Sequence, residues 1–217
     1  MKTKSVRQLI TGVMLIASFI MWTILIQTID VKPVGVNGTS IGFSTLNVRF
    51  HSFTGVNMTL YSITDWLGLV PLFVCMIFAV IGFVQLIKRK SLFKVDFSLM
   101  ILGGYYVTVI LCYLFFEMVP INYRPVLIDG FMEASYPSST TLLVLSVMPT
   151  FIFQVKKRVN KKIIKRILCA VANLFSAFIV IGRVFSGVHW ITDIIGAVLL
   201  SAGLFYIYKS IVIIKEV

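Results

Sequence analysis

The sequence has few charged residues and no paired cysteines. Only 13% of its 217 residues are charged, whereas 59% are hydrophobic. Because a soluble domain carries about a quarter charged residues, this composition indicates a polytopic membrane protein. The three cysteines, Cys75, Cys112 and Cys169, lie far apart inside apolar runs. Their spacing argues against both a disulfide framework and a cysteine metal site.

Histidine is also scarce, since the chain contains only His51 and His189. No cluster of histidines and carboxylates shows metal-ligand spacing, so we expect no bound metal and no other cofactor. The formal net charge of +12 resembles that of a nucleic-acid-binding protein. The basic residues fall in clusters between apolar runs, however, which is typical of cytoplasmic loops. We therefore expect the chain to contact a lipid bilayer and no nucleic acid.

Six apolar runs are long enough to cross a bilayer as helices. The first has a basic start but is too long for the apolar part of a signal peptide, so we expect it to be retained. The sequence thus predicts an all-α fold and a single membrane domain over residues 1–217. The expected spans are about 9–29, 66–87, 95–116, 137–155, 167–185 and 188–208.

The longest expected loop covers residues 30–65. Phe43, Leu46, Phe50 and Phe53 recur in it at spacings of three and four, which predicts a short amphipathic helix at the membrane surface. Asp65 stands just before the second span and is expected to cap it.

The basic residues are distributed unevenly between the two sides of the expected bundle. With six spans, 16 of the 20 lysines and arginines fall on the side that carries both termini. The positive-inside rule therefore predicts that both termini are cytoplasmic. The other side holds only four basic residues, which are Lys32, Arg49, Arg124 and Arg183.

Three segments on that outer side carry polar residues that could converge. The stretch from Gly182 to Asp193 reads GRVFSGVHWITD and places Arg183, His189 and Asp193 between two apolar runs. Ionisable residues at the edge of a membrane segment suggest a functional site. Arg124 precedes a proline, and the segment SYPSST at residues 135–140 begins the fourth span.

Two arginines and the amino-terminal ends of two helices suit a phosphate group. Arginine binds phosphate oxygens in a bidentate manner, and the start of a helix offers free N–H groups. Because a metal site is not expected, covalent catalysis remains. A neutral imidazole can attack phosphorus if a carboxylate holds its other nitrogen. His189 and Asp193 are four residues apart, so on a helix they would share one face.

These motifs resemble the type 2 phosphatidic acid phosphatase family of membrane lipid phosphatases. The third family motif, Ser-Arg-x5-His-x3-Asp, matches Arg183, His189 and Asp193, with Gly182 in place of the serine. The first, Lys-x6-Arg-Pro, retains Arg124 and its proline but has Glu117 at the lysine position. The second, Pro-Ser-Gly-His, reads Pro137, Ser138, Ser139 and Thr140. The resemblance extends from roughly the second span to the end of the chain.

The resemblance implies a metal-independent reaction, which the distribution of basic residues would place at the outer face of the plasma membrane. It implies that His189 is the nucleophile and that Asp193 orients it. Arg124 and Arg183, with Ser138 and the backbone around Ser139, would bind phosphate. The implied substrates are lipid phosphates or diphosphates, with undecaprenyl diphosphate, phosphatidic acid and phosphatidylglycerol phosphate as candidates.

Two positions depart from the family pattern. Glu117 replaces a cation with an anion; it could pair with Arg124 or face away from the site. Thr140 replaces the histidine that donates a proton to the leaving oxygen, and a threonine hydroxyl is too weak an acid for that role. Thr140 could be an engineered substitution, a natural variant with another proton donor, or the mark of a non-catalytic relative. His51 is the only other histidine and is one candidate donor.

Three functions remain open at this stage. The chain could hydrolyse lipid phosphates, bind or transport them without hydrolysis, or transfer the phosphoryl group to another hydroxyl. The sequence does not indicate the oligomeric state.

Overall fold

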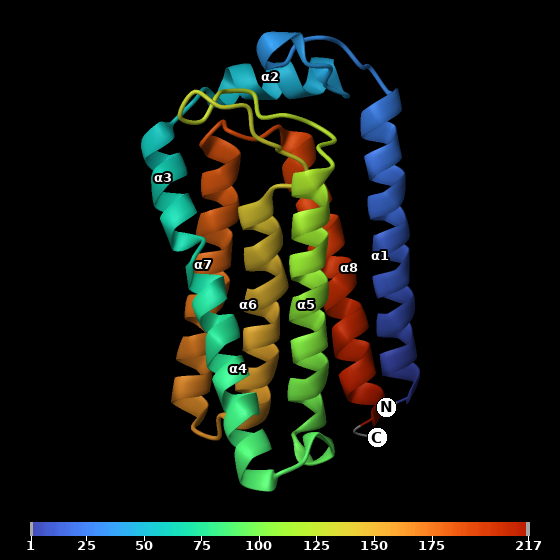
Figure 1. Ribbon diagram of the computed structural model, residues 1–217, viewed down its shortest axis with the longest axis vertical. Coiled ribbons are helices and arrows are strands. Elements are labelled where there is room, and N and C mark those ends of the chain that lie inside the picture. The colour runs from blue at the N-terminus through green and yellow to red at the C-terminus, as the bar shows by residue number, and fades with distance from the viewer. Residues whose placement is uncertain (1, 216–217) are drawn as a thin grey trace.

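The computed structural model describes residues 2–215, which form helices and no β-strand, as the sequence predicts. Six helical segments of the described chain are long and apolar enough to cross a membrane. They run side by side, and the start of α1 lies at the same end of the bundle as the end of α8 (Figure 1). The segments are α1 (Lys2–Thr28), α3 and α4 together (Met58–Leu67 and Val70–Arg89), α5 (Phe97–Met118), α6 (Ser139–Arg158), α7 (Lys162–Phe185) and α8 (Ile191–Lys215).

The segment between α1 and α4 is more helical than the sequence predicts. It contains the 3-10 turn η1 (Val36–Gly38) and the expected short helix, α2 (Ser44–Thr54), which lies across the end of the bundle (Figure 1). The prediction of a loop up to residue 65 is wrong, because α3 begins at Met58. Asn57 caps α3 by accepting a hydrogen bond of 2.9 Å from the N–H of Leu60. Asp65 therefore does not cap a helix; it lies in the last turn of α3.

Helix α6 lies in the middle of the bundle and packs against α4, α5, α7 and α8. It carries buried polar side chains, and polar groups inside a membrane require internal partners. The Tyr106 hydroxyl lies 2.9 Å from Thr150 Oγ1, and Gln154 Nε2 donates to the Tyr208 hydroxyl over 2.8 Å. These bonds fix the position of α6 relative to α5 and α8.

Helix α1 packs closely along α8. A Cβ atom added at Gly12 would lie 3.0 Å from the carbonyl oxygen of Gly203, so glycine permits the contact. Nearer the site, Trp22 Nε1 donates to the carbonyl of Thr192 over 3.1 Å, and Thr23 Oγ1 lies 2.7 Å from the Tyr136 hydroxyl. These contacts join α1 to both segments that flank the candidate site.

A polar network holds the opposite end of the bundle, where α5 follows the 3-10 turn η2 (Leu92–Lys94). Asp96 receives hydrogen bonds from Gln85 at 3.0 Å, and from Arg158 and Arg89 at 2.9 Å each. The hydrogen bond from Gln85, together with the two arginines, lowers the pKa of Asp96 to about 2. The network therefore links the ends of α4 and α6 to the start of α5.

Candidate active site

His189 lies in the turn between α7 and α8. Gly187 makes this turn possible, because its φ is +68° and a Cβ atom there would overlap the carbonyl of Gly55. His189 is 5% exposed, and its Nδ1 lies 3.1 Å from the carbonyl oxygen of Ser135. A carbonyl can only accept, so Nδ1 of the neutral ring carries the proton. The lone pair is then on Nε2, for which no hydrogen-bond partner exists within residues 2–215.

The relation between His189 and Asp193 differs from the expected one. Because α8 begins at Ile191, His189 lies before the helix, and the prediction that both share one helical face is wrong. Asp193 Oδ2 accepts the Trp190 N–H at 2.9 Å and lies 3.7 Å from His189 Nδ1. That separation is too long for a hydrogen bond. The carbonyl of Ser135 thus holds the ring directly, with the carboxylate close behind it.

The two arginines converge on one aromatic ring. Arg183, in the last turn of α7, and Arg124, in the segment between α5 and α6, place their Cζ atoms 5.0 Å and 5.5 Å from the centre of the Tyr61 ring. Each also pairs with a carboxylate. Arg183 Nη2 lies 2.8 Å from Asp65 Oδ1, and Arg124 Nη2 lies 3.0 Å from Glu133 Oε2. Both guanidinium groups are therefore held in place without any ligand.

Most of the remaining N–H groups of these arginines have no acceptor. Nε and Nη1 of both Arg124 and Arg183 are buried and have no hydrogen-bond partner among the described residues. Leaving a buried charged donor unsatisfied is unfavourable by more than the roughly 1–3 kcal/mol typical of a neutral one. These four nitrogen positions are therefore suited to an anion. An anion with several oxygens, such as phosphate, matches their planar geometry.

The electrostatic surroundings keep His189 neutral. Burial is the main cause, and the positive charges of Arg124 and Arg183 add to it; together they lower the pKa of His189 well below its usual 6.5. A neutral imidazole with a free Nε2 is the form required of a nucleophile.

The start of α6 provides fewer free donors than the sequence suggests. The Ser138 N–H donates to the carbonyl of Asp193 at 3.2 Å, and its hydroxyl donates to Thr141 Oγ1 at 3.0 Å. Ser138 therefore joins α6 to α8. The Thr140 hydroxyl accepts a hydrogen bond from Arg183 Nη2, which brings it beside the site. Ser139 and Thr140 also line a pocket of about 400 Å³, whose other walls come from α3, α4 and α5.

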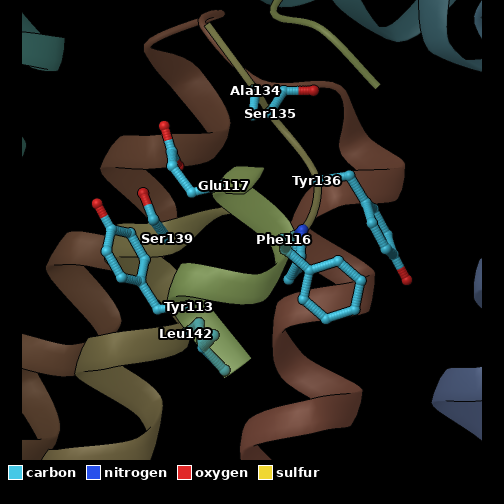
Figure 2. A pocket seen from close by; sticks show the side chains of 9 residues that line it. Tyr113, Phe116, Glu117, Ala134, Ser135, Tyr136, Ser139 and Leu142 are labelled. Carbon is cyan, nitrogen blue, oxygen red and sulfur yellow. The ribbon is translucent and has the colours of Figure 1, made fainter. Parts of the chain in front are cut away.

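Glu117 and His51 lie at the edge of the site and form no hydrogen bond or ion pair with the side chains of Arg124, Arg183 or His189 among the described residues. Of the two possibilities for Glu117, pairing with Arg124 is not the one that the structure shows, because Arg124 pairs with Glu133. Glu117 is exposed and lines a small pocket with Tyr113 and Ser139, as Figure 2 shows. His51 Nε2 lies 3.0 Å from the carbonyl of Gly187, so its proton is used to join α2 to the turn that carries His189.

Several site residues escaped the sequence analysis. Tyr61, Asp65 and Glu133 surround the arginines, and Ser135 holds the His189 ring. Asp65 alone gave a signal, since it is an acid at the edge of a long apolar segment. Tyr61 reaches the site from α3, and Glu133 and Ser135 reach it from the segment between α5 and α6. The spacing of residues in the sequence does not predict how these segments fold onto the site.

The bundle and these residues together define a membrane-spanning helical protein with a buried site suited to an oxyanion. Residues 69–215 match the family model described as the PAP2 superfamily, so the chain belongs to that superfamily. Its fold is similar to that in a crystal structure described as the first transmembrane PAP2-type phosphatidylglycerolphosphate phosphatase from Bacillus subtilis. The two share 18% sequence identity with a TM-score of 0.62, over 95% of this chain and 97% of that one. The search of curated proteins found no match.

Proposed function

We propose that this protein is a membrane lipid phosphate phosphatase that works through a phosphohistidine at His189. The observation that carries the proposal is that Nε2 of His189 and the Nε and Nη1 groups of Arg124 and Arg183 are all buried and without a partner among the described residues. The positive charges of both arginines also act on the imidazole. Membership in the PAP2 superfamily supports a lipid phosphatase at the level of the class.

In the proposed reaction the arginines bind the phosphate oxygens, and Nε2 attacks phosphorus. The bond from phosphorus to the lipid oxygen breaks, and the lipid leaves with that electron pair on its oxygen. The proton on Nδ1 stays in place, held by the carbonyl of Ser135 and facing Asp193. Water then cleaves the N–P bond and regenerates the imidazole. Because the imidazole supplies the nucleophile and the guanidinium groups supply the positive charge, the reaction as proposed needs no metal ion or cofactor.

We further propose that the site faces outward at the plasma membrane. The basic residues concentrate at the other end, near the end of α4, the end of α6 and the start of α7. The positive-inside rule assigns that end to the cytoplasm. An outward site would meet lipid phosphates such as undecaprenyl diphosphate, phosphatidic acid or phosphatidylglycerol phosphate. A cysteine at the exposed Asp129 should react with an impermeant reagent on intact cells; labelling only after permeabilisation would reverse this orientation.

Thr140 favours a second candidate function. Without a proton donor at this position, the same arginines could bind a lipid phosphate for transport, or the phosphoryl group could pass to an acceptor other than water. Both alternatives use the same phosphate site. A binding or transport protein would leave the lipid phosphate intact, and a phosphotransferase would yield a phosphorylated acceptor instead of free phosphate.

The test is phosphate release from lipid phosphates by the purified chain in the presence of a chelator. We expect release by the unaltered protein, a lower rate for Asp193→Asn and none for His189→Ala. Acid-labile labelling of His189 from a phosphate-labelled substrate would identify the intermediate. Release by His189→Ala at the unaltered rate would refute the mechanism. Phosphate binding without release by any form would support the binding protein instead.

A further inference from the structure

The surroundings of Thr140 lack an effective proton donor. Its hydroxyl accepts the Arg183 N–H, its side chain is 8% exposed, and its methyl group would lie 3.0 Å from a Cβ added at Gly68. An alcohol is about as weak an acid as water. Thr140 therefore holds Arg183 but cannot protonate a departing oxygen.

The other polar groups near Thr140 are poorly placed to replace it. Asp65 and Glu133 form ion pairs with the two arginines, so they act there as acceptors. Arginine itself does not lose its proton in proteins. Tyr61 lies against both guanidinium groups. The last two neighbours are the Tyr113 hydroxyl in the pocket of Thr140 and the exposed Glu117 in the adjoining pocket of Figure 2. Within residues 2–215 neither is hydrogen-bonded to Thr140 or to Arg183, whose side-chain partners are Asp65 and Thr140.

A site without a proton donor depends on how well the leaving group carries negative charge. When a phosphate monoester is cleaved, the leaving oxygen becomes an alkoxide, whose conjugate acid is about as weak as water. When a diphosphate is cleaved, the leaving group is a phosphate monoester, whose second pKa is about 6. The second leaving group departs as a stable anion and requires no proton.

We propose that Thr140 determines the specificity of this site and makes it selective for lipid diphosphates over lipid monophosphates. The proposal rests on the phosphatase function proposed above. His189 Nε2 forms a bond to the terminal phosphorus, the bond from that phosphorus to the bridging oxygen breaks, and the electron pair stays on the bridging oxygen. The lipid leaves as a monophosphate dianion. Water then attacks the phosphohistidine, the N–P bond breaks, and both hydrogens of the water leave with the product as dihydrogen phosphate.

The structure also provides a place for the leaving phosphate. Arg183 is hydrogen-bonded through Nη2 to Thr140 in the first turn of α6, a helix of 20 residues, and its buried Nε and Nη1 groups have no partner among the described residues. The start of a helix stabilises an anion through its free N–H groups and its dipole. The pocket of about 400 Å³ beside Ser139 and Thr140 continues between apolar residues of α4 and α5, which suit the first carbons of a lipid chain.

The test compares decyl diphosphate with decyl monophosphate, which have the same saturated chain. For the unaltered protein we expect kcat/KM to be at least about 100-fold higher for the diphosphate, since a general acid contributes about 10²–10⁴-fold. Thr140→His should raise monophosphate hydrolysis by a factor in that range and reduce the ratio correspondingly. Similar rates on the two substrates, or a ratio that Thr140→His leaves unchanged, would overturn the proposal.

Further measurements keep the test decisive. In a series of aryl phosphates, the rate of the unaltered protein should depend steeply on the acidity of the leaving phenol, which requires no variant. Tyr113→Phe and His51→Ala should leave the diphosphate-to-monophosphate ratio unchanged; a selective loss of monophosphate hydrolysis in either would reveal a donor and refute the inference. His189→Ala distinguishes the proposed phosphohistidine mechanism from the proposed selectivity for diphosphates. Hydrolysis by His189→Ala would refute the mechanism, whatever the ratio of diphosphate to monophosphate hydrolysis.

Discussion

Replacing Arg183 by lysine tests whether the guanidinium fork, rather than positive charge alone, binds the substrate. Lysine keeps the charge but loses the planar group, and with it the two N–H positions that have no partner among the described residues. A hydrogen bond to a charged group contributes about 1.5–3 kcal/mol. Losing one to two such bonds should weaken transition-state binding by about 3 kcal/mol. At about 1.4 kcal/mol per tenfold, kcat/KM should fall roughly 100-fold.

The assay is kcat/KM for a short-chain lipid phosphate in detergent, together with the melting temperature of each variant. Arg89→Lys is the matched control, because Arg89 also pairs with a carboxylate, at 2.9 Å from Asp96, but at the opposite end of the bundle. It should change kcat/KM by no more than about twofold, as expected for an exposed ion pair.

Equal losses in Arg183→Lys and Arg89→Lys would show that the effect reflects general destabilisation. An unchanged kcat/KM in Arg183→Lys would place the phosphate elsewhere. If Arg183→Lys does not fold, Arg124→Lys allows the same comparison, since Arg124 offers the same two unpartnered positions.

Two further predictions concern the turn that carries the nucleophile. Gly187→Ala should lower both the melting temperature and the activity, because φ is +68° and a Cβ atom would overlap the carbonyl of Gly55. The control is Gly38→Ala, whose position also has a positive φ but has open space around it. This control should retain activity. The lowered pKa of His189 means that its reactive neutral form persists as pH falls below 6.5. After correction for substrate ionisation, kcat/KM should therefore show no acid limb from His189 near pH 6.5. A loss centred there in both the unaltered protein and Asp193→Asn, which lacks the neighbouring buried carboxyl group, would contradict the described environment.

The sequence predicts the bundle well because the physical signal is strong and local. Apolar runs of about 20 residues define membrane helices whatever their neighbours are. It also identifies Arg124, Arg183 and His189 as candidates, because charged residues are unusual in such a chain. In the structure the two arginines converge on the Tyr61 ring, and their charges contribute to lowering the pKa of His189.

The parts that were missed depend on contacts between distant segments. Nothing in local spacing shows that the carbonyl of Ser135 holds the His189 ring, or that Glu133 rather than Glu117 pairs with Arg124. The position of Asp65 was misjudged because the start of α3 depends on Asn57, eight residues earlier, and not on the apolar run that follows. Every residue has a backbone carbonyl, so the residue types cannot show that the carbonyl of Ser135 is the one that binds His189.

Tyr61 and Asp65 lie outside residues 69–215, where the chain matches its superfamily, yet both contact Arg183. The site is thus divided between two parts of the chain. The matched part holds His189, the proposed nucleophile, whereas the preceding part supplies the counter-charge and the aromatic surface. Substitutions ahead of residue 69 can consequently alter how strongly an anion is held without touching the nucleophile. Substrate preference and chemical mechanism can therefore diverge independently in proteins built on this plan.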